Sequence, residues 1–116
     1  MFIKAIVRKP GKSLVNGLSS ADLGIPNYKK ALAQHAEYTK ALESCGLEVV
    51  VMEEVEEYPD STFIEDAALL TADCAIITNP GAPSRKGEIA NVKTILGRYY
   101  VNIEEVSAPG TVEGGD

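Results

Sequence analysis

The stretch Pro59-Asp60-Ser61-Thr62-Phe63-Ile64-Glu65-Asp66 and the residues that follow it, AALLTADCAIIT (67–78), decide the fold. Two apolar runs, residues 63–70 and 74–78, are separated by Thr71-Ala72-Asp73. Short apolar runs joined by polar turn residues are typical of antiparallel strands. The stretch therefore predicts a β-hairpin with carboxylates at its entrance.

The residues before this stretch predict a strand, a loop, a helix and a second strand. Residues 2–8 are apolar enough for a strand, and the Gly- and Ser-rich residues 11–26 predict a loop. A helix is expected from Asn27, which can cap its start, to Gly46, a residue type that commonly ends helices. The apolar run of residues 47–52 then predicts a buried strand.

After the hairpin, the sequence predicts another helix and two more strands. Asn79-Pro80-Gly81-Ala82-Pro83 cannot belong to a helix or a central strand, because it contains two prolines and a glycine. A helix is expected over residues 84–99, followed by strands at 101–106 and from 111 onward. The helix residues expected to face the core are Ile89, Val92, Ile95, Leu96 and Tyr99.

The order of these elements suggests an internal repeat. A helix, a strand, a loop with proline and a strand with acidic residues occur twice, and an offset of about 50 residues places Pro59 on Pro109 and Asp66 on Asp116. We therefore expect one α/β domain that contains two repeats, approximately residues 1–60 and 61–116, as in propeller-like folds.

Composition excludes several classes of protein. The chain has 116 residues, 11 basic and 17 acidic side chains and a net charge of −6, the profile of a soluble intracellular domain. No apolar run approaches the roughly 18 residues of a membrane span, and no signal peptide is recognisable, so we expect a cytoplasmic protein. Two cysteines and one histidine are too few for a disulfide scaffold or a zinc site. Net acidity and the absence of Trp argue against nucleic-acid binding.

Charge is sorted along the chain. Residues 1–40 hold seven basic and two acidic side chains, whereas residues 41–84 hold ten acidic side chains and no Lys or Arg. The acids of residues 53–57 are expected to form a solvated face. Asp60, Glu65 and Asp66 lie among apolar residues, where carboxylates are candidates for a site that receives a cation.

The three carboxylates suit two tasks, holding a planar cation or binding a hard metal ion. Asp60 and Asp66 are six residues apart, so they would face the same side of an extended strand, and Glu65 the other side. A Ca²⁺ loop needs more oxygen ligands at tighter spacing, which favours the planar cation. Arg85, at the start of the predicted helix, would either bind an anionic group of a substrate or be solvated.

Three motifs together resemble the dimethylarginine dimethylaminohydrolase family, within the pentein or amidinotransferase-like superfamily. They are Pro59-Asp60 with Phe63-Ile64-Glu65-Asp66, Pro80-Gly81-Ala82-Pro83-Ser84-Arg85-Lys86-Gly87-Glu88, and Ala108-Pro109-Gly110-Thr111-Val112-Glu113-Gly114-Gly115-Asp116. The resemblance covers the whole chain and implies a five-bladed α/β propeller of ββαβ modules, of which the chain would supply about two. Asn79 stands where family members often carry Arg.

The resemblance also implies roles for six residues. Leu18 matches a lid residue that closes over the substrate. Asp60, Glu65 and Asp66 match carboxylates that bind the guanidinium or lie next to it. Arg85 matches an arginine that binds the amino-acid end of the substrate, and Glu113 matches the acid that orients the catalytic histidine.

The implied reaction is attack of a cysteine thiolate on the guanidinium carbon of Nω-methylated arginine, which gives citrulline and a methylamine without metal or cofactor. The family's catalytic His and Cys lie beyond Glu113-Gly114-Gly115-Asp116, so we expect the chain to be the N-terminal, substrate-binding part and inactive alone. His35, Cys45 and Cys74 are interpreted as packing or surface residues. Arginine deimination, amidino transfer and a non-catalytic cation-binding module remain alternatives.

The implied propeller predicts self-association. Two modules without neighbours would expose strand edges and an apolar helix flank, and both features favour association between chains. We expect a dimer, or exchange of a terminal segment, when light scattering is coupled to size exclusion over a hundredfold concentration range. A strictly monomeric mass with a sharp cooperative melt would contradict this expectation.

Overall fold

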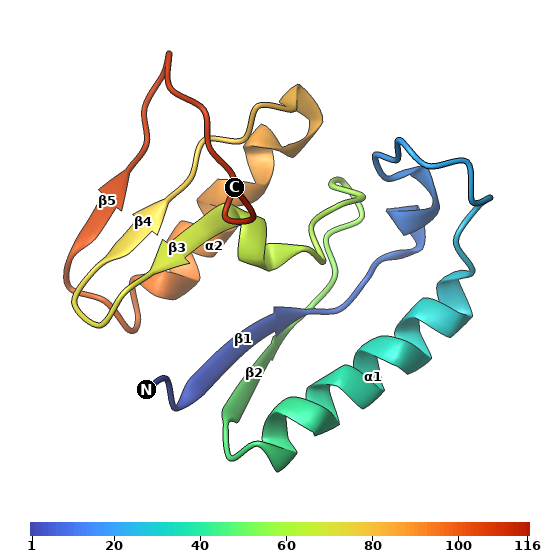
Figure 1. The fold of residues 1–116 in the computed structure, drawn as a ribbon, viewed down its shortest axis with the longest axis horizontal. Coiled ribbons are helices and arrows are strands. Elements are labelled where there is room, and N and C mark those ends of the chain that lie inside the picture. The colour runs from blue at the N-terminus through green and yellow to red at the C-terminus, as the bar shows by residue number, and fades with distance from the viewer. The chain divides into compact units, whose positions relative to one another are not determined.

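Parallel pairing of β1 (Lys4–Arg8) with β2 (Glu48–Met52) organises the first part of the chain (Figure 1). The computed structural model describes all residues from 1 to 116, and they divide into two compact units, residues 1–62 and 63–116. The register places Lys4 opposite Glu48. Parallel neighbours need a long crossover connection, and the intervening helix supplies it.

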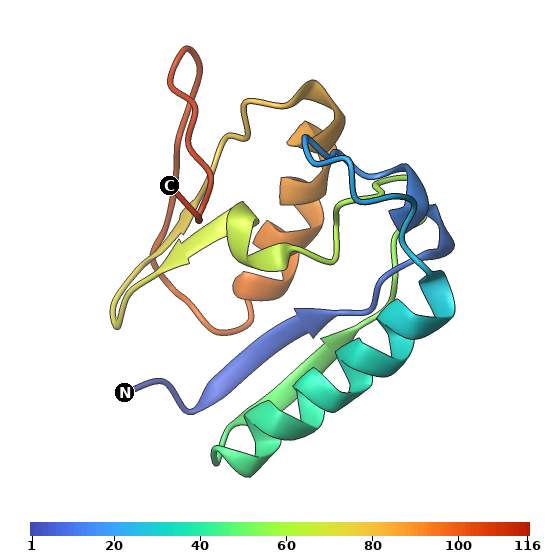
Figure 2. The same ribbon diagram turned by 45° about the vertical axis from the view of Figure 1, so that its right-hand side comes forward.

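This crossover helix, α1 (Tyr28–Ser44), begins and ends as the sequence predicts. The Asn27 side chain accepts a hydrogen bond from the Lys30 backbone N–H at 2.9 Å, which caps the first turn. Gly46 has φ of 86°, a left-handed conformation that glycine adopts without a steric penalty. The helix then runs alongside β1 and β2 (Figure 2).

Two expectations for this unit need correction. The strand predicted over residues 47–52 is present, but it is half-buried rather than buried, and Val51 is 41% exposed. The reason is that β2 has only β1 as a neighbour in its sheet. The predicted loop of residues 11–26 contains a short 3₁₀ helix, η1 (Lys12–Asn16).

The second unit contains the predicted hairpin. Strands β3 (Ala68–Leu70) and β4 (Ala75–Ile77) pair antiparallel, which confirms it. The residues before β3 are not strand, however, because η2 (Ile64–Ala67) is a 3₁₀ helix. Acidic residues in the first turn of a helix interact favourably with its dipole, and Glu65 and Asp66 stand there.

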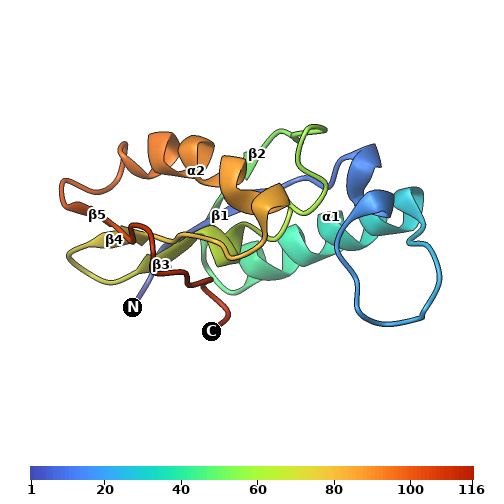
Figure 3. The same cartoon turned by 90° about the horizontal axis from the view of Figure 1, so that it is seen from above.

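A third strand and a helix complete this unit. Strand β5 (Ile103–Glu105) pairs parallel with β4, which gives the strand order β3-β4-β5. Helix α2 (Ile89–Leu96) follows the 3₁₀ helix η3 (Pro83–Glu88), and Figure 3 shows α2 beside the β4–β5 pair. The buried apolar side chains of the unit are Ala67, Ala75, Ile77, Pro80, Val92, Ile95 and Leu96.

The predicted helix over residues 84–99 is therefore shorter, and its start is 3₁₀. Val92, Ile95 and Leu96 are buried as expected, but Tyr99 lies beyond the end of α2 and is exposed. The strand expected from residue 111 is reduced to one antiparallel bridge between Asn79 and Val112.

Each unit contains one parallel strand–helix–strand crossover, β1-α1-β2 in the first and β4-α2-β5 in the second. The mixed α/β class that the sequence predicts is thus confirmed. That the two units are repeats of one module stays a prediction. No helix of the chain has both the length and the apolar character needed to cross a membrane.

Candidate functional site

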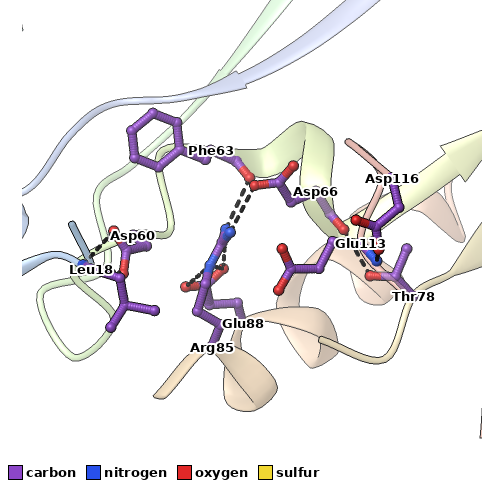
Figure 4. A network of polar contacts seen from close by, with 9 residues as sticks. All are labelled: Leu18, Asp60, Phe63, Asp66, Thr78, Arg85, Glu88, Glu113 and Asp116. Carbon is purple, nitrogen blue, oxygen red and sulfur yellow. Dashed lines mark hydrogen bonds and ion pairs between the residues drawn. The ribbon is translucent and has the colours of Figure 1, made fainter. Parts of the chain in front are cut away.

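A buried ion cluster in the second unit gathers three of the motif residues. Arg85 is 7% exposed and donates from Nη1 to Asp66 Oδ2 at 2.7 Å and from Nη2 to Glu88 Oε2 at 2.9 Å (Figure 4). Its Nη2 also donates to the Phe63 carbonyl oxygen at 3.2 Å. The interpretation of Arg85 as a solvated side chain is therefore wrong.

The cluster keeps its arginine charged. Burial alone lowers the pKa of Arg85, but hydrogen bonds and opposite charges from Glu88 and Asp66 outweigh burial and raise that pKa above its ordinary value. The cluster thus joins one guanidinium to two carboxylates. Glu88, which sequence analysis did not assign to the site, is as buried as Arg85.

The local sequence explains how Arg85 and Glu88 meet. Pro83 stands at the start of η3, where its missing N–H costs nothing. A 3₁₀ helix has about three residues per turn, so side chains three apart lie on one side. Arg85 and Glu88 have this spacing, and it is the signal in the sequence that could have identified Glu88.

The backbone of Asp66 connects the cluster to the Glu113 segment. Its carbonyl oxygen accepts a hydrogen bond from Thr78 Oγ1 at 2.8 Å and one from the Gly114 backbone N–H at 2.9 Å. A Cβ atom at Gly114 would collide with the Glu65 carbonyl oxygen, so only glycine allows this approach. Thr78 and Gly114 were also missed as site residues.

Glu113 is half-buried and sits next to this anchor. Its backbone N–H donates to Asp116 Oδ2 at 2.9 Å, which closes a turn at residues 113–116. In the view of Figure 4 the Glu113 side chain points toward the side on which the Arg85 cluster lies. The second unit therefore brings together Asp66, Arg85 and Glu113, with the exposed Glu65 beside Asp66.

In the first unit, Asp60 is buried and holds the backbone of Leu18. Both carboxylate oxygens of Asp60 accept from the Leu18 N–H, at 3.2 and 3.1 Å, whereas the Leu18 side chain is 62% exposed. The prediction that Asp60 and Asp66 face the same side of a strand is wrong. Neither residue lies in a strand, because Asp60 falls in a turn and Asp66 in η2.

His35 and Cys45 do not form a catalytic pair. They are ten residues apart along α1 and its C-terminal cap, about 15 Å at the helical rise. The pKa of His35 lies below its ordinary value, mainly because the ring is partly buried. The Lys9 charge also lowers this pKa, whereas a hydrogen bond with the Arg8 backbone raises it. The His35 ring lies 6.4 Å from that of Tyr38, which agrees with a packing role.

Asn79 stands at the position where the family named above often carries Arg, and it is hydrogen-bonded to other residues of its own unit. Its Nδ2 donates to the Gly110 carbonyl oxygen at 2.6 Å, and its Oδ1 accepts from Lys86 Nζ at 3.4 Å. The Asn79 backbone carbonyl also accepts from the Val112 N–H at 3.0 Å. These contacts hold the turn before Glu113.

Comparison with known proteins gives consistent results. Residues 24–113 match the family described as N,N dimethylarginine dimethylhydrolase, eukaryotic. The N(G),N(G)-dimethylarginine dimethylaminohydrolase of Pseudomonas aeruginosa is 48% identical over the whole chain, and the chain spans 46% of that relative's length.

Solved structures similar to this chain include members of the same family. A dimethylarginine dimethylaminohydrolase adduct with S-methyl-L-thiocitrulline matches with a TM-score of 0.98 at 48% identity, over 100% of this chain and 46% of the other. A mutant of the P. aeruginosa enzyme complexed with citrulline matches with a TM-score of 0.96 at 47% identity, with the same coverage of both chains. The N-terminal domain of a cyanobacterial arginine dihydrolase, at 17% identity, shares the fold with a TM-score of 0.85 over 98% of this chain and 43% of that one.

Replacing Thr78 with Val should loosen the Asp66 anchor. The change keeps the shape of a buried side chain and removes one hydrogen bond, so we expect a loss of about 1 kcal/mol in the free energy of unfolding, measured in urea. Amide exchange at Gly114 should accelerate as well. Thr78→Ser should restore most of both effects, and Thr94→Val on the exposed side of α2 is the matched control. Equal effects of the Thr78 and Thr94 variants would contradict the anchor.

Proposed function

Since the chain belongs to the N,N dimethylarginine dimethylhydrolase family, we propose that it forms the substrate-binding part of an enzyme that hydrolyses Nω-methylated arginine. The products would be citrulline and a methylamine. The observation that carries this proposal is the buried Arg85–Asp66–Glu88 cluster, which fixes the orientation of the Asp66 carboxylate.

The proposed role of Asp66 and Glu65 is to hold the substrate guanidinium. A guanidinium is planar and donates through a fixed fork, so it is bound best by carboxylate oxygens that are already oriented. Asp66 is oriented by Arg85 through its side chain and by Thr78 and Gly114 through its carbonyl. This preorganisation lowers the entropy that binding would otherwise cost.

We assign complementary roles to the remaining predicted residues. Arg85 fixes Asp66 and is proposed to face the amino-acid end of the substrate. Glu113 is proposed to orient the catalytic histidine. Leu18, whose backbone N–H donates to Asp60, is proposed to act as the lid residue. None of these roles requires a metal or an organic cofactor.

The covalent step would be attack of a cysteine thiolate on the guanidinium carbon. The methylamine leaves with a proton, and water then cleaves the carbon–sulfur bond to release citrulline. Carboxylates that fix the guanidinium also fix its carbon relative to the sulfur, and such alignment supplies a large part of the rate of a reaction between bound groups.

Replacing Asp66 or Asp60 with Asn should weaken binding of dimethylarginine. Each change removes a charged acceptor worth about 1.5 to 3 kcal/mol, so the dissociation constant measured by calorimetry should rise about 10- to 100-fold. Glu104→Gln, an exposed substitution on β5, is the control. A solvated face at residues 53–57 would make Glu56→Gln neutral as well, but Glu56 accepts two backbone hydrogen bonds and cannot serve as a control. Unchanged affinity in both Asp variants would exclude the proposed site.

The chain alone should bind dimethylarginine without hydrolysing it. The carboxylates proposed here bind substrate and carry out no covalent step, and His35 and Cys45 are too far apart to act together. Purified chain incubated with dimethylarginine should produce no citrulline above background. Citrulline formation that requires Cys45 or Cys74 would contradict the assignment of these cysteines to packing.

A further inference from the structure

Glu56 bonds to a backbone segment distant in sequence, although the sequence predicts a solvated side chain. Its Oε1 accepts from the Lys12 N–H at 2.6 Å, and its Oε2 accepts from the Ser13 N–H at 2.9 Å. The acids of residues 53–57 are exposed, as predicted, but Glu56 also makes these two backbone hydrogen bonds. The neighbouring Glu57 is also exposed and has no such contact.

These bonds extend the parallel pairing of the first unit. The last backbone bond between the two segments runs from the Lys9 N–H to the Met52 carbonyl oxygen at 3.1 Å. Beyond it, Lys9 Nζ pairs with Glu53 at 3.0 Å, and Lys12 then bonds to Glu56, both across 44 positions in the sequence. Carboxylates thus continue the register after the two backbones separate.

Glu56 caps η1 from outside the helix. The first N–H groups of a helix lack partners within it, and a side chain at the N-cap position usually accepts from them. The N-cap of η1 is Gly11, which has no side chain to do so. Hydrogen bonds from the Lys12 and Ser13 backbone lower the pKa of Glu56, which shows that they favour its charged form.

The glycines at both ends of η1 leave room for the two carboxylates. A Cβ atom at Gly11 would lie 2.9 Å from Glu56 Oε1, and one at Gly17 would lie 2.5 Å from Asp60 Oδ1. Both distances are too short for a real Cβ contact. The segment of residues 11–18 is therefore held at its start by Glu56 and at its end by Asp60, which bonds to Leu18.

We propose that Glu56 is a positioning residue for Leu18, the predicted lid residue, because Glu56 fixes the start of the segment whose end Asp60 fixes. Only the backbone of Leu18 is held, and its exposed side chain stays available to contact a ligand. The inference rests on the proposed function for the nature of that ligand, Nω-methylated arginine. The geometry of residues 11–18 would then depend on Glu56, which lies outside this segment and is not one of the carboxylates proposed to bind substrate.

Amide hydrogen exchange in Glu56→Gln and Glu57→Gln, followed by NMR, tests the contact itself. Gln offers one acceptor oxygen in place of two, so exchange at Lys12 or Ser13 should accelerate about tenfold in Glu56→Gln, with a smaller increase at Leu18. Glu57→Gln should match the unchanged protein, as should the amides of β3 and β4 in both variants. Unchanged exchange at residues 12 and 13 in Glu56→Gln would overturn the proposal.

Measurements with added dimethylarginine distinguish a positioning role of Glu56 from a purely structural one. In the unchanged chain it should slow exchange at Leu18, and in Glu56→Gln this effect should shrink while the dissociation constant rises about tenfold. Faster exchange with unchanged affinity would show that Glu56 only stabilises the loop, and would overturn the inference. If the unchanged chain does not bind dimethylarginine, the proposed function fails, and the exchange data alone decide whether Glu56 fixes the segment.

Gly11→Ala provides a second route to the same result. It leaves every charge in place and pushes the Glu56 carboxylate away through the added Cβ atom. If Glu56→Gln does not fold, Gly11→Ala should show the same local increase in exchange at Lys12 and Ser13. Normal exchange in Gly11→Ala would overturn the proposal.

Discussion

The buried guanidinium of Arg85 is the constraint on which the candidate site depends. A charge removed from water must be paired and hydrogen-bonded, or its burial costs more than the fold can offset. Asp66, Glu88 and the Phe63 carbonyl meet this demand. Satisfying Arg85 therefore fixes η2 relative to η3, and with η2 it fixes the carboxylates proposed to receive the substrate.

Acidic residues and glycines lie against each other in both units, through the carboxylates in the first unit and through the backbone in the second. Asp60 lies against Gly17 and Glu56 against Gly11, while Gly114 lies against the backbone of Glu65 and Asp66. In each pair the glycine allows an approach that a side chain would block, and a hydrogen bond then holds the segments together. The acidic residues thus determine where the loops lie, in addition to any role in binding.

Sequence reasoning succeeded where the signal was local and periodic. The boundaries of α1 followed from Asn27 and Gly46, and the hairpin of β3 and β4 followed from two apolar runs and a polar turn. It failed for η2 and η3, since a 3₁₀ helix of four to six residues is too short to show a period. Without η2, the sequence could not give the orientations of Asp60 and Asp66. The partners of Glu56, 44 and 43 positions away, could not be found from a local pattern either.

The absence of Lys and Arg from residues 41–84 has a structural consequence. Apart from Glu43, which follows Lys40 by three residues, the acids of this segment have no cation close by in the sequence. The ion pairs that they form therefore join them to other parts of their own unit. Glu48 pairs with Lys4 and Glu53 with Lys9, while Asp66 pairs with Arg85. The two exposed pairs contribute little stability, but they favour the same register as the strands they flank. The buried pair has the larger effect, because removing Asp66 would leave the Arg85 charge without one of its partners away from water.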